Sequence, residues 1–189
     1  VARKKNSHRR EGSGRGGDTP AVNESVREAA KRLASLGAEV EEISIPMHLT
    51  AASVWMPIGT EGMTQTMMMG DGYGLSRTDL YSTSLMDAHR GWRGQADSLS
   101  ETTKLLLLFG TYINNNFGPR FYGKALNISR RVTAAYDKAL ASYDLLLMPT
   151  TPMKATPLPA PGAPREEIVG RAFEMISNTS PFDISHHPA

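Results

Sequence analysis

A long amphipathic helix that leads directly into a short apolar strand is the feature that most constrains the fold of this chain. Between about residues 119 and 143, apolar side chains recur every three or four positions, which predicts one buried helix face. They are Phe121, Ala125, Ile128, Val132, Tyr136 and Leu140. The segment Asp144–Met148 is then apolar after its first residue and ends at Pro149, as expected for a strand buried on both faces.

This helix-then-strand order predicts an α/β fold with a parallel or mixed central sheet flanked by helices. Ligand sites in such sheets lie beyond the carboxyl ends of the strands. The loop 150–164 should therefore lie near a functional site. Because it contains five prolines, we expect it to follow an extended path over the surface.

An earlier segment repeats the helix-then-strand order. A helix is predicted from about Thr19 to Leu36, with the Thr19 side chain as N-cap and Gly37 after its end. Its apolar stripe contains Val22, Val26, Ala29, Leu33 and Leu36. The mostly alternating Glu39–Ile45 segment then predicts a strand that Pro46 ends.

The middle of the chain is predicted to be helical with interruptions. From His48 to Met69 the pattern is broken by Pro57, Gly59 and Gly62, so we expect two short helices or one kinked helix. Further helices are predicted near residues 78–87, 98–112 and 165–176.

Both ends of the chain differ from the rest. Residues 1–18 have neither helix nor strand periodicity, so we expect an irregular segment there and one folded unit over residues 19–189. Pro181–Ala189 is predicted to be a loop with no apolar element to hold it. We expect an α/β fold that is incomplete at both ends.

Composition narrows the class of protein. The first 16 residues hold six of the 21 Lys and Arg residues and one of the 19 acids. The remaining residues carry 15 basic and 18 acidic side chains, a net charge of −3 that argues against a nucleic-acid surface. The chain has no cysteine and no apolar run long enough to cross a membrane. We therefore expect a cytoplasmic protein without disulfides.

Three patterns offer alternative sites, and each has a simpler explanation. Residues 12–17 fit the dinucleotide pattern G-x-G-x-x-G, but no apolar strand precedes them. His186 or His187 with Asp183 and a serine could form a catalytic triad, although no serine lies in a G-x-S-x-G elbow. The five histidines lack metal-binding spacing, so no metal site and no cofactor are predicted.

Two blocks of sequence resemble the amidase signature family. They are Asp144–Pro152 and Asn178–Ala189, and the resemblance extends over nearly everything after residue 10. Residues 19–189 would then be the C-terminal-side part of an amidase domain. The family hydrolyses carboxamides with two serines and a lysine carried upstream of the part that this chain matches. The Gly-Ser-Ser-Gly-Gly sequence that would carry them does not occur here, so no catalytic residue is assigned.

The resemblance does imply substrate-binding residues. Trp55 and Ile176 match apolar residues that line the acyl side of the pocket, and Asn178 and Thr179 begin a loop near the site. An apolar wall with a few polar groups suits a small aromatic or aliphatic amide. The family usually has glycine at the position of His186, where a β-carbon is expected to crowd close backbone packing.

Three hypotheses follow for function. The leading one is part of an amidase that forms a serine acyl-enzyme, binds a small-molecule amide, and needs neither nucleic acid nor membrane. A homodimer is an open option for the full-length protein. The second is a non-catalytic amidase-like binding or structural subunit. The third is a nucleic-acid-binding domain that uses residues 1–16, and it predicts salt-sensitive binding to DNA.

Overall fold

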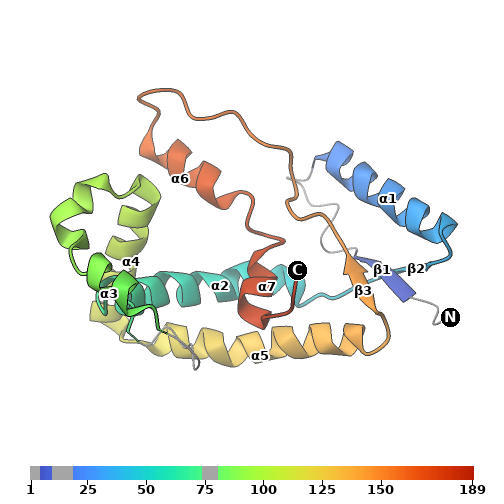
Figure 1. The fold of residues 1–189 in the computed structure, drawn as a ribbon, viewed down its shortest axis with the longest axis horizontal. Coiled ribbons are helices and arrows are strands. Elements are labelled where there is room, and N and C mark those ends of the chain that lie inside the picture. The colour runs from blue at the N-terminus through green and yellow to red at the C-terminus, as the bar shows by residue number, and fades with distance from the viewer. Residues whose placement is uncertain (1–4, 10–18, 74–80) are drawn as a thin grey trace.

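The computed structural model describes residues 5–9, 19–73 and 81–189, with only the backbone described for residues 5–9. The chain is mostly helical, and its small sheet lies at one end, at the right of Figure 1. Strand β1 (Lys5–Arg9) lies between β2 (Glu39–Ile43) and β3 (Leu145–Leu147), and both pairings are parallel. A mixed sheet is therefore not seen among the described strands.

Two features of this sheet differ from the sequence expectation. Lys5–Arg9 forms the middle strand although its side chains show no periodicity, because two neighbouring strands satisfy its backbone groups. Strand β3 pairs only with β1 in the described sheet, and Leu145 is 57% exposed. The prediction that this strand is buried on both faces is wrong for these residues.

Helix α1 (Pro20–Ser35) confirms the first predicted helix, and β2 confirms a shorter version of the strand after it. Gly37 follows the helix with φ of +93°, a conformation that favours glycine. Thr19 precedes the helix, but its side chain makes no capping hydrogen bond. Its backbone N–H instead donates to the Pro152 carbonyl at 2.9 Å, which ties α1 to the segment after β3.

Helix α2 (His48–Gly62) continues through Pro57 and Gly59, so neither residue ends it. The α-helix ends at Gly62, the third predicted interruption, and residues Met63–Met68 form a π-helical segment, η1. Met69 then donates its backbone N–H to the Thr64 carbonyl at 2.9 Å, five residues back.

Helix α5 (Arg120–Leu140) confirms the long amphipathic helix, and three residues of its predicted stripe are buried. It runs beside α2, and α7 (Ser180–Ser185) packs against both (Figure 1). The buried core lies where these three helices meet. It contains Ile45, Ala51, Val54, Ala125, Val132, Tyr136 and Ile184.

Helix α7 was not predicted, because the pattern of apolar residues in Pro181–Ala189 is that of a loop. The local signals for a helix start are nevertheless present. Pro181 occupies an early position of the first turn, and Asp183 supplies a negative charge there. The helix buries Ser180, Pro181, Ile184 and Ser185, so the C-terminal segment is held by packing.

The remaining helices lie away from the sheet, toward the left of Figure 1. They are α3 (Thr83–His89), the 3-10 helix η2 (Trp92–Ser98), α4 (Glu101–Phe117) and α6 (Arg165–Phe173). Residues 148–164 reach α6 by a long excursion without helix or strand (Figure 1).

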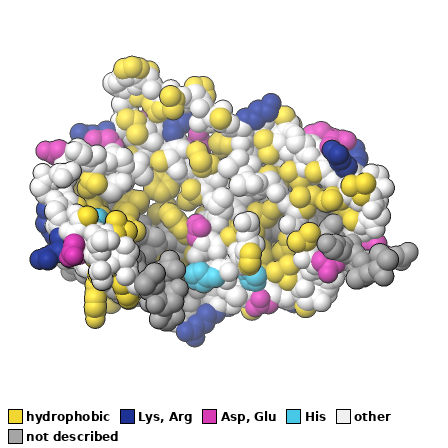
Figure 2. All heavy atoms as spheres, in the orientation of Figure 1, with side chains coloured by type: hydrophobic (Ala, Val, Ile, Leu, Met, Phe, Trp, Pro, Cys, Tyr) yellow, Lys and Arg dark blue, Asp and Glu magenta, His cyan; other side chains and the backbone are white. Residues whose placement is uncertain are grey.

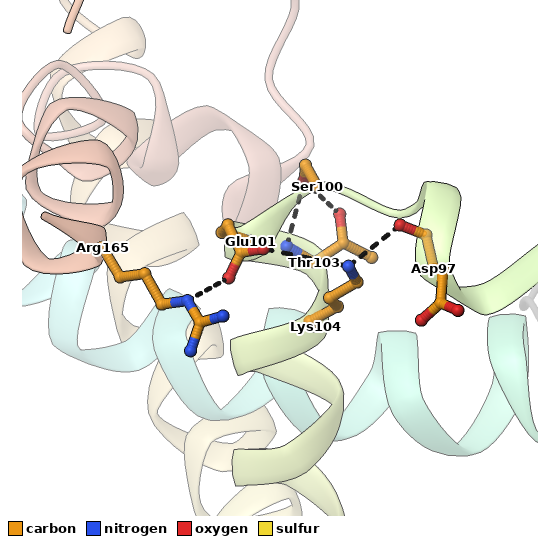
Figure 3. Close-up of polar contacts among 6 residues, drawn as sticks. All are labelled: Asp97, Ser100, Glu101, Thr103, Lys104 and Arg165. Carbon is orange, nitrogen blue, oxygen red and sulfur yellow. Dashed lines mark hydrogen bonds and ion pairs between the residues drawn. The ribbon is translucent and has the colours of Figure 1, made fainter. Parts of the chain in front are cut away.

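The start of α4 is capped by side chains, and α6 is anchored to it (Figure 3). Ser100 accepts from the Thr103 backbone N–H at 3.2 Å, and Lys104 donates to the Asp97 carbonyl at 3.0 Å. Arg165, the first residue of α6, pairs with Glu101 at 2.9 Å. Because Arg165 is largely exposed, this pair orients α6 more than it stabilises the fold.

Candidate functional site

A cavity of about 890 Å³ runs along β3, from Asp144 before the strand to Thr150 beyond its carboxyl end. Its walls come from the end of α5, from β3 and the residues on either side of it, and from the segment around α7. The apolar part includes Tyr136, Leu140, Met148 and Phe182. Only the part of the cavity at Met148–Thr150 lies where parallel-sheet topology predicts a ligand site.

A chain of buried hydrogen bonds supports the floor of this cavity. His48, the first residue of α2, lies with Nδ1 3.0 Å from the Tyr136 hydroxyl and Nε2 3.1 Å from Asn178 Oδ1. The Asn178 amide nitrogen donates to the Pro149 carbonyl at 2.9 Å, directly after β3. All three side chains are at most 1% exposed. The chain therefore joins the end of the strand to the loop before α7.

The geometry also assigns the proton on a neutral His48. Because the Asn178 nitrogen faces Pro149, its Oδ1 faces the histidine and can only accept a hydrogen bond. The His48 Nε2 then donates, and Nδ1 accepts from the Tyr136 hydroxyl. Each polar group in the chain has a partner of the right kind, which is the arrangement that makes a buried network rigid.

Two of the four predicted binding residues line this cavity. They are Asn178 and Thr179. Asn178 is committed to the buried network, whereas the Thr179 hydroxyl donates to the Ile176 carbonyl at 3.3 Å. Thr179 is the more accessible of the two. It is therefore the polar side chain of the pair that is better placed to meet a ligand.

The other two predicted binding residues, Trp55 and Ile176, do not line this cavity. Trp55 is half-buried and packs against the core cluster. A β-carbon at Gly59 would lie 3.1 Å from the Trp55 ring, so Gly59 leaves room for the indole one turn away. Ile176 is half-buried and contributes its backbone carbonyl to the Thr179 contact. The structure thus brings together only the two adjacent residues.

The histidine that could have formed a triad has different neighbours from those expected. His187 Nε2 lies 3.0 Å from Asp137 Oδ1, and Nδ1 lies 3.1 Å from the Ser185 hydroxyl. The expected acid, Asp183, takes no part in these contacts. Ser185 is 5% exposed and is not among the residues that line the cavity. A hydroxyl buried outside the cavity is poorly placed for attack on a bound carbonyl, so we assign it no nucleophilic role.

His186 follows α7 in the left-handed conformation, with φ of +60°. Its side chain is exposed, and the expected crowding by its β-carbon stays a prediction. Positive φ is a conformation that glycine adopts at no steric cost, so the backbone at this position favours glycine over histidine.

Sequence reasoning missed the parts of the site that depend on distant contacts. His48 and Tyr136 are 88 positions apart, and no spacing pattern joins them. Tyr136 was predicted to be buried, but its hydroxyl partner was not. One signal was available: a histidine at the start of an otherwise apolar helix needs a polar partner if it is buried.

Neither a metal-binding cluster nor a membrane-spanning helix is found among the described residues. Among the described side chains, no group of three or more His, Asp or Glu residues could hold a metal ion. Within the same residues, no helix combines the length and the apolar character that a membrane span requires.

Comparison with known proteins gives a consistent result. The sequence matches the profile of the Amidase family over residues 14–189. It is 40% identical over 179 residues to an enantioselective amidase of Rhodococcus rhodochrous, an alignment that covers 92% of this chain and 35% of the relative. It is 31% identical to a glutamyl-tRNA(Gln) amidotransferase subunit of a Synechococcus strain over 72% of this chain and 28% of the relative.

The fold is also similar to that of a solved structure. The corresponding glutamyl-tRNA(Gln) amidotransferase subunit of Thermotoga maritima superposes with a TM-score of 0.54 and 19% identity. The match covers 96% of this chain and 33% of that protein. The chain thus spans about a third of the length of the amidase and of the solved structure that it matches.

Proposed function

This chain belongs to the Amidase family, and from that premise we propose that it is part of an enzyme that hydrolyses a small carboxamide to a carboxylate and ammonia. The observation that carries the proposal is the 40% identity to an enantioselective amidase over 92% of the chain. The proposed enzyme is cytoplasmic, and its central sheet extends beyond the three described strands.

The chemistry divides between this chain and residues outside it. Amide hydrolysis needs a nucleophile, a proton shuttle and donors that stabilise the oxyanion of the tetrahedral intermediate. We place the nucleophile, a serine that forms an acyl-enzyme, with its second serine and lysine in a segment that precedes Val1. This chain supplies scaffold and part of the pocket wall.

The cavity along β3 suits the role of pocket wall. Its lining combines apolar surface from Tyr136, Leu140 and Phe182 with the polar groups of Asn178 and Thr179. Small-molecule sites usually have this composition, because apolar surface provides binding free energy and a few polar groups fix orientation. Thr179 would orient the amide. Trp55 and Ile176 do not line this cavity, so their role on the acyl side rests on the family resemblance alone.

The test is hydrolysis of benzamide by the longer protein that carries this chain. We expect ammonia release, and we expect Thr179→Val to raise KM about threefold to tenfold because one hydrogen bond is lost. Thr83→Val, at an exposed threonine of α3, is the matched control and should leave KM unchanged. Binding of benzamide without any ammonia release would contradict the proposal.

A non-catalytic, amidase-like subunit is the second candidate. The observation in its favour is that relatives such as the Synechococcus protein are named as one subunit of an amidotransferase. The two candidates differ in the sequence that precedes Val1. A serine, a second serine and a lysine in the family arrangement would support the hydrolase, and their replacement would support the non-catalytic candidate.

A further inference from the structure

A second cavity, of about 570 Å³, extends along α2 from Ala52 to Glu61. It lies between α2, α4 and α5 and is mostly apolar. Met56 and Pro57 of α2, Phe109 and Ile113 of α4 and Phe121 of α5 provide most of that surface. Among the described residues, none lines both this cavity and the one along β3.

One carboxyl group lines this apolar cavity. Glu61 is only 4% exposed, and among the described residues its Oε1 has no hydrogen-bond partner. The backbone N–H of Tyr122, in the first turn of α5, donates to the carboxyl. Burial raises the pKa of Glu61, and the Tyr122 hydrogen bond opposes that rise. The carboxyl therefore lies at the start of α5 with its Oε1 left unsatisfied among the described residues.

The cavity is maintained by a close helix contact rather than by loose packing. A β-carbon at Gly110 of α4 would lie 2.9 Å from the Thr60 carbonyl and closer still to the Thr64 hydroxyl. Only glycine allows α4 to approach α2 this closely. Phe109 and Ile113 flank Gly110 and form the α4 wall of the cavity. The walls are thus fixed on helices, as in a preformed ligand site.

We propose that this cavity binds a small apolar primary amine, with the ammonium group paired to Glu61. A volume of 570 Å³ accommodates a phenyl or short alkyl group. An ammonium group has three hydrogen-bond donors, and one of them can bond to Glu61 Oε1. Its positive charge also stabilises the ionised form of the buried carboxylate. An apolar carboxylate of the same size would bring repulsion instead.

No charged side chain among the described residues forms a hydrogen bond with Glu61 Oε1. Arg120 stacks over the Phe121 ring at 5.3 Å, but it is exposed and is not among the residues that line the cavity. Large hydrophobic side chains of α4 are exposed, among them Leu108 and the cavity residue Phe109, and hydrophobic side chains are spread over much of the face in Figure 2. The surface around the cavity is therefore suited to the apolar part of the same ligand.

The inference does not depend on amide hydrolysis, and its test measures binding directly. The full chain, labelled with ¹³C in the methionine methyl groups, is titrated with 2-phenylethylamine at neutral pH. We expect a saturable shift of the Met56 methyl resonance. The same titration with phenylacetate should leave that resonance unmoved.

Three variants complete the test. Glu61→Gln keeps the shape of the side chain and should weaken amine binding at least about tenfold, as expected for loss of a charged partner. Ser53→Trp should fill the cavity and abolish binding while leaving Glu61 in place. Asp183→Asn removes a carboxylate from the other cavity and should have no effect.

An unmoved Met56 resonance in the unmodified chain would overturn the proposal. Equal binding by the Glu61→Gln variant would overturn it as well, since the ammonium would then have a different partner. Loss of binding in Asp183→Asn, with binding retained in Ser53→Trp, would move the amine to the cavity along β3.

Discussion

The two ends of helix α2 each carry a buried polar side chain, but the two side chains differ in their hydrogen bonding. His48, at the first residue of the helix, has partners for both ring nitrogens. Glu61, near the last residue, has an oxygen that is without a partner among the described residues. Both side chains are at most 4% exposed. The comparison separates a polar group that stabilises the fold from one that is available to a ligand.

A buried polar group that is fully hydrogen-bonded loses little on leaving water, whereas an unsatisfied one costs about 1–3 kcal/mol. Substitution of His48 should therefore lower the free energy of unfolding. Removal of the charge at Glu61 should raise it.

Replacement of His48 should have the largest effect. His48→Leu leaves the Tyr136 hydroxyl and the Asn178 side chain without one of their partners in a buried site. We expect the free energy of unfolding to fall by about 3 kcal/mol, measured by urea denaturation. Leu49→Ala, at the exposed next residue, should change it by less than about 0.5 kcal/mol. Equal effects of the two variants would show that the buried network contributes nothing.

A methyl group at Gly110 should have the next largest effect. Gly110→Ala forces α4 away from Thr60 and Thr64, and overpacking of this kind costs about 1–3 kcal/mol. Gly123→Ala is the matched control within a helix, because no atom outside its own helix lies within 4 Å of the added carbon. It should raise the stability by up to about 1 kcal/mol. Thermal unfolding of both variants gives the comparison, and a stable Gly110→Ala protein would contradict the close approach.

Removal of the charge at Glu61 should act in the opposite direction from His48→Leu. Because burial raises the pKa of Glu61 above the ordinary value of 4.5, the folded chain holds this proton when the unfolded chain has released it. The Glu61 contribution to stability therefore falls as the pH rises from about 4.5 through the folded-state pKa. Glu61→Gln should flatten that slope and raise the stability at pH 7 by about 1 kcal/mol.

Urea denaturation of the Glu61→Gln variant and of the unmodified chain between pH 4 and pH 8 tests this prediction. Thr83→Val, at an exposed residue of α3 that does not titrate, is the control and should preserve the slope. A steeper slope in Glu61→Gln would contradict the assigned cause.

The smallest effect on stability is expected for substitution of His186, which follows α7. His186 has φ of +60°, which is unfavourable for a residue with a β-carbon. His186→Gly should raise the free energy of unfolding by about 0.5–1 kcal/mol. His187→Gly, at the neighbouring residue that contacts Asp137 and Ser185, should not raise it. A loss of stability in His186→Gly would show that the imidazole makes a contact worth more than the backbone strain.

Local signals were sufficient for the parts of the fold that local forces determine. The stripe that contains Ala125, Val132 and Tyr136 predicted α5 and its buried face, and Gly37 correctly marked the end of α1. Gly62 was one of three predicted interruptions of the helix that starts at His48, and the α-helix does end there, but the π-helical form of the next residues was not predicted.

The features that were missed depend on distant partners. Strand β1 is defined by its two neighbours, and α7 is buried by α2 and α5. The same holds for the site: Asn178 and Thr179 were predicted beside the pocket, but the role of Asn178 comes from His48, 130 positions away. The orphan oxygen of Glu61 has no signature in a single sequence, since burial and partners are properties of the folded chain.

The central claim is that this chain provides scaffold and pocket wall for an amide hydrolase while its nucleophile lies elsewhere. Ammonia release from benzamide by the 189-residue chain alone, beside its Ser185→Ala variant, tests it most directly. The account predicts no release by either protein above the rate of the buffer. Steady release by the unmodified chain that is lost in Ser185→Ala would contradict it, because Ser185, His187 and Asp137 would then be a working catalytic set.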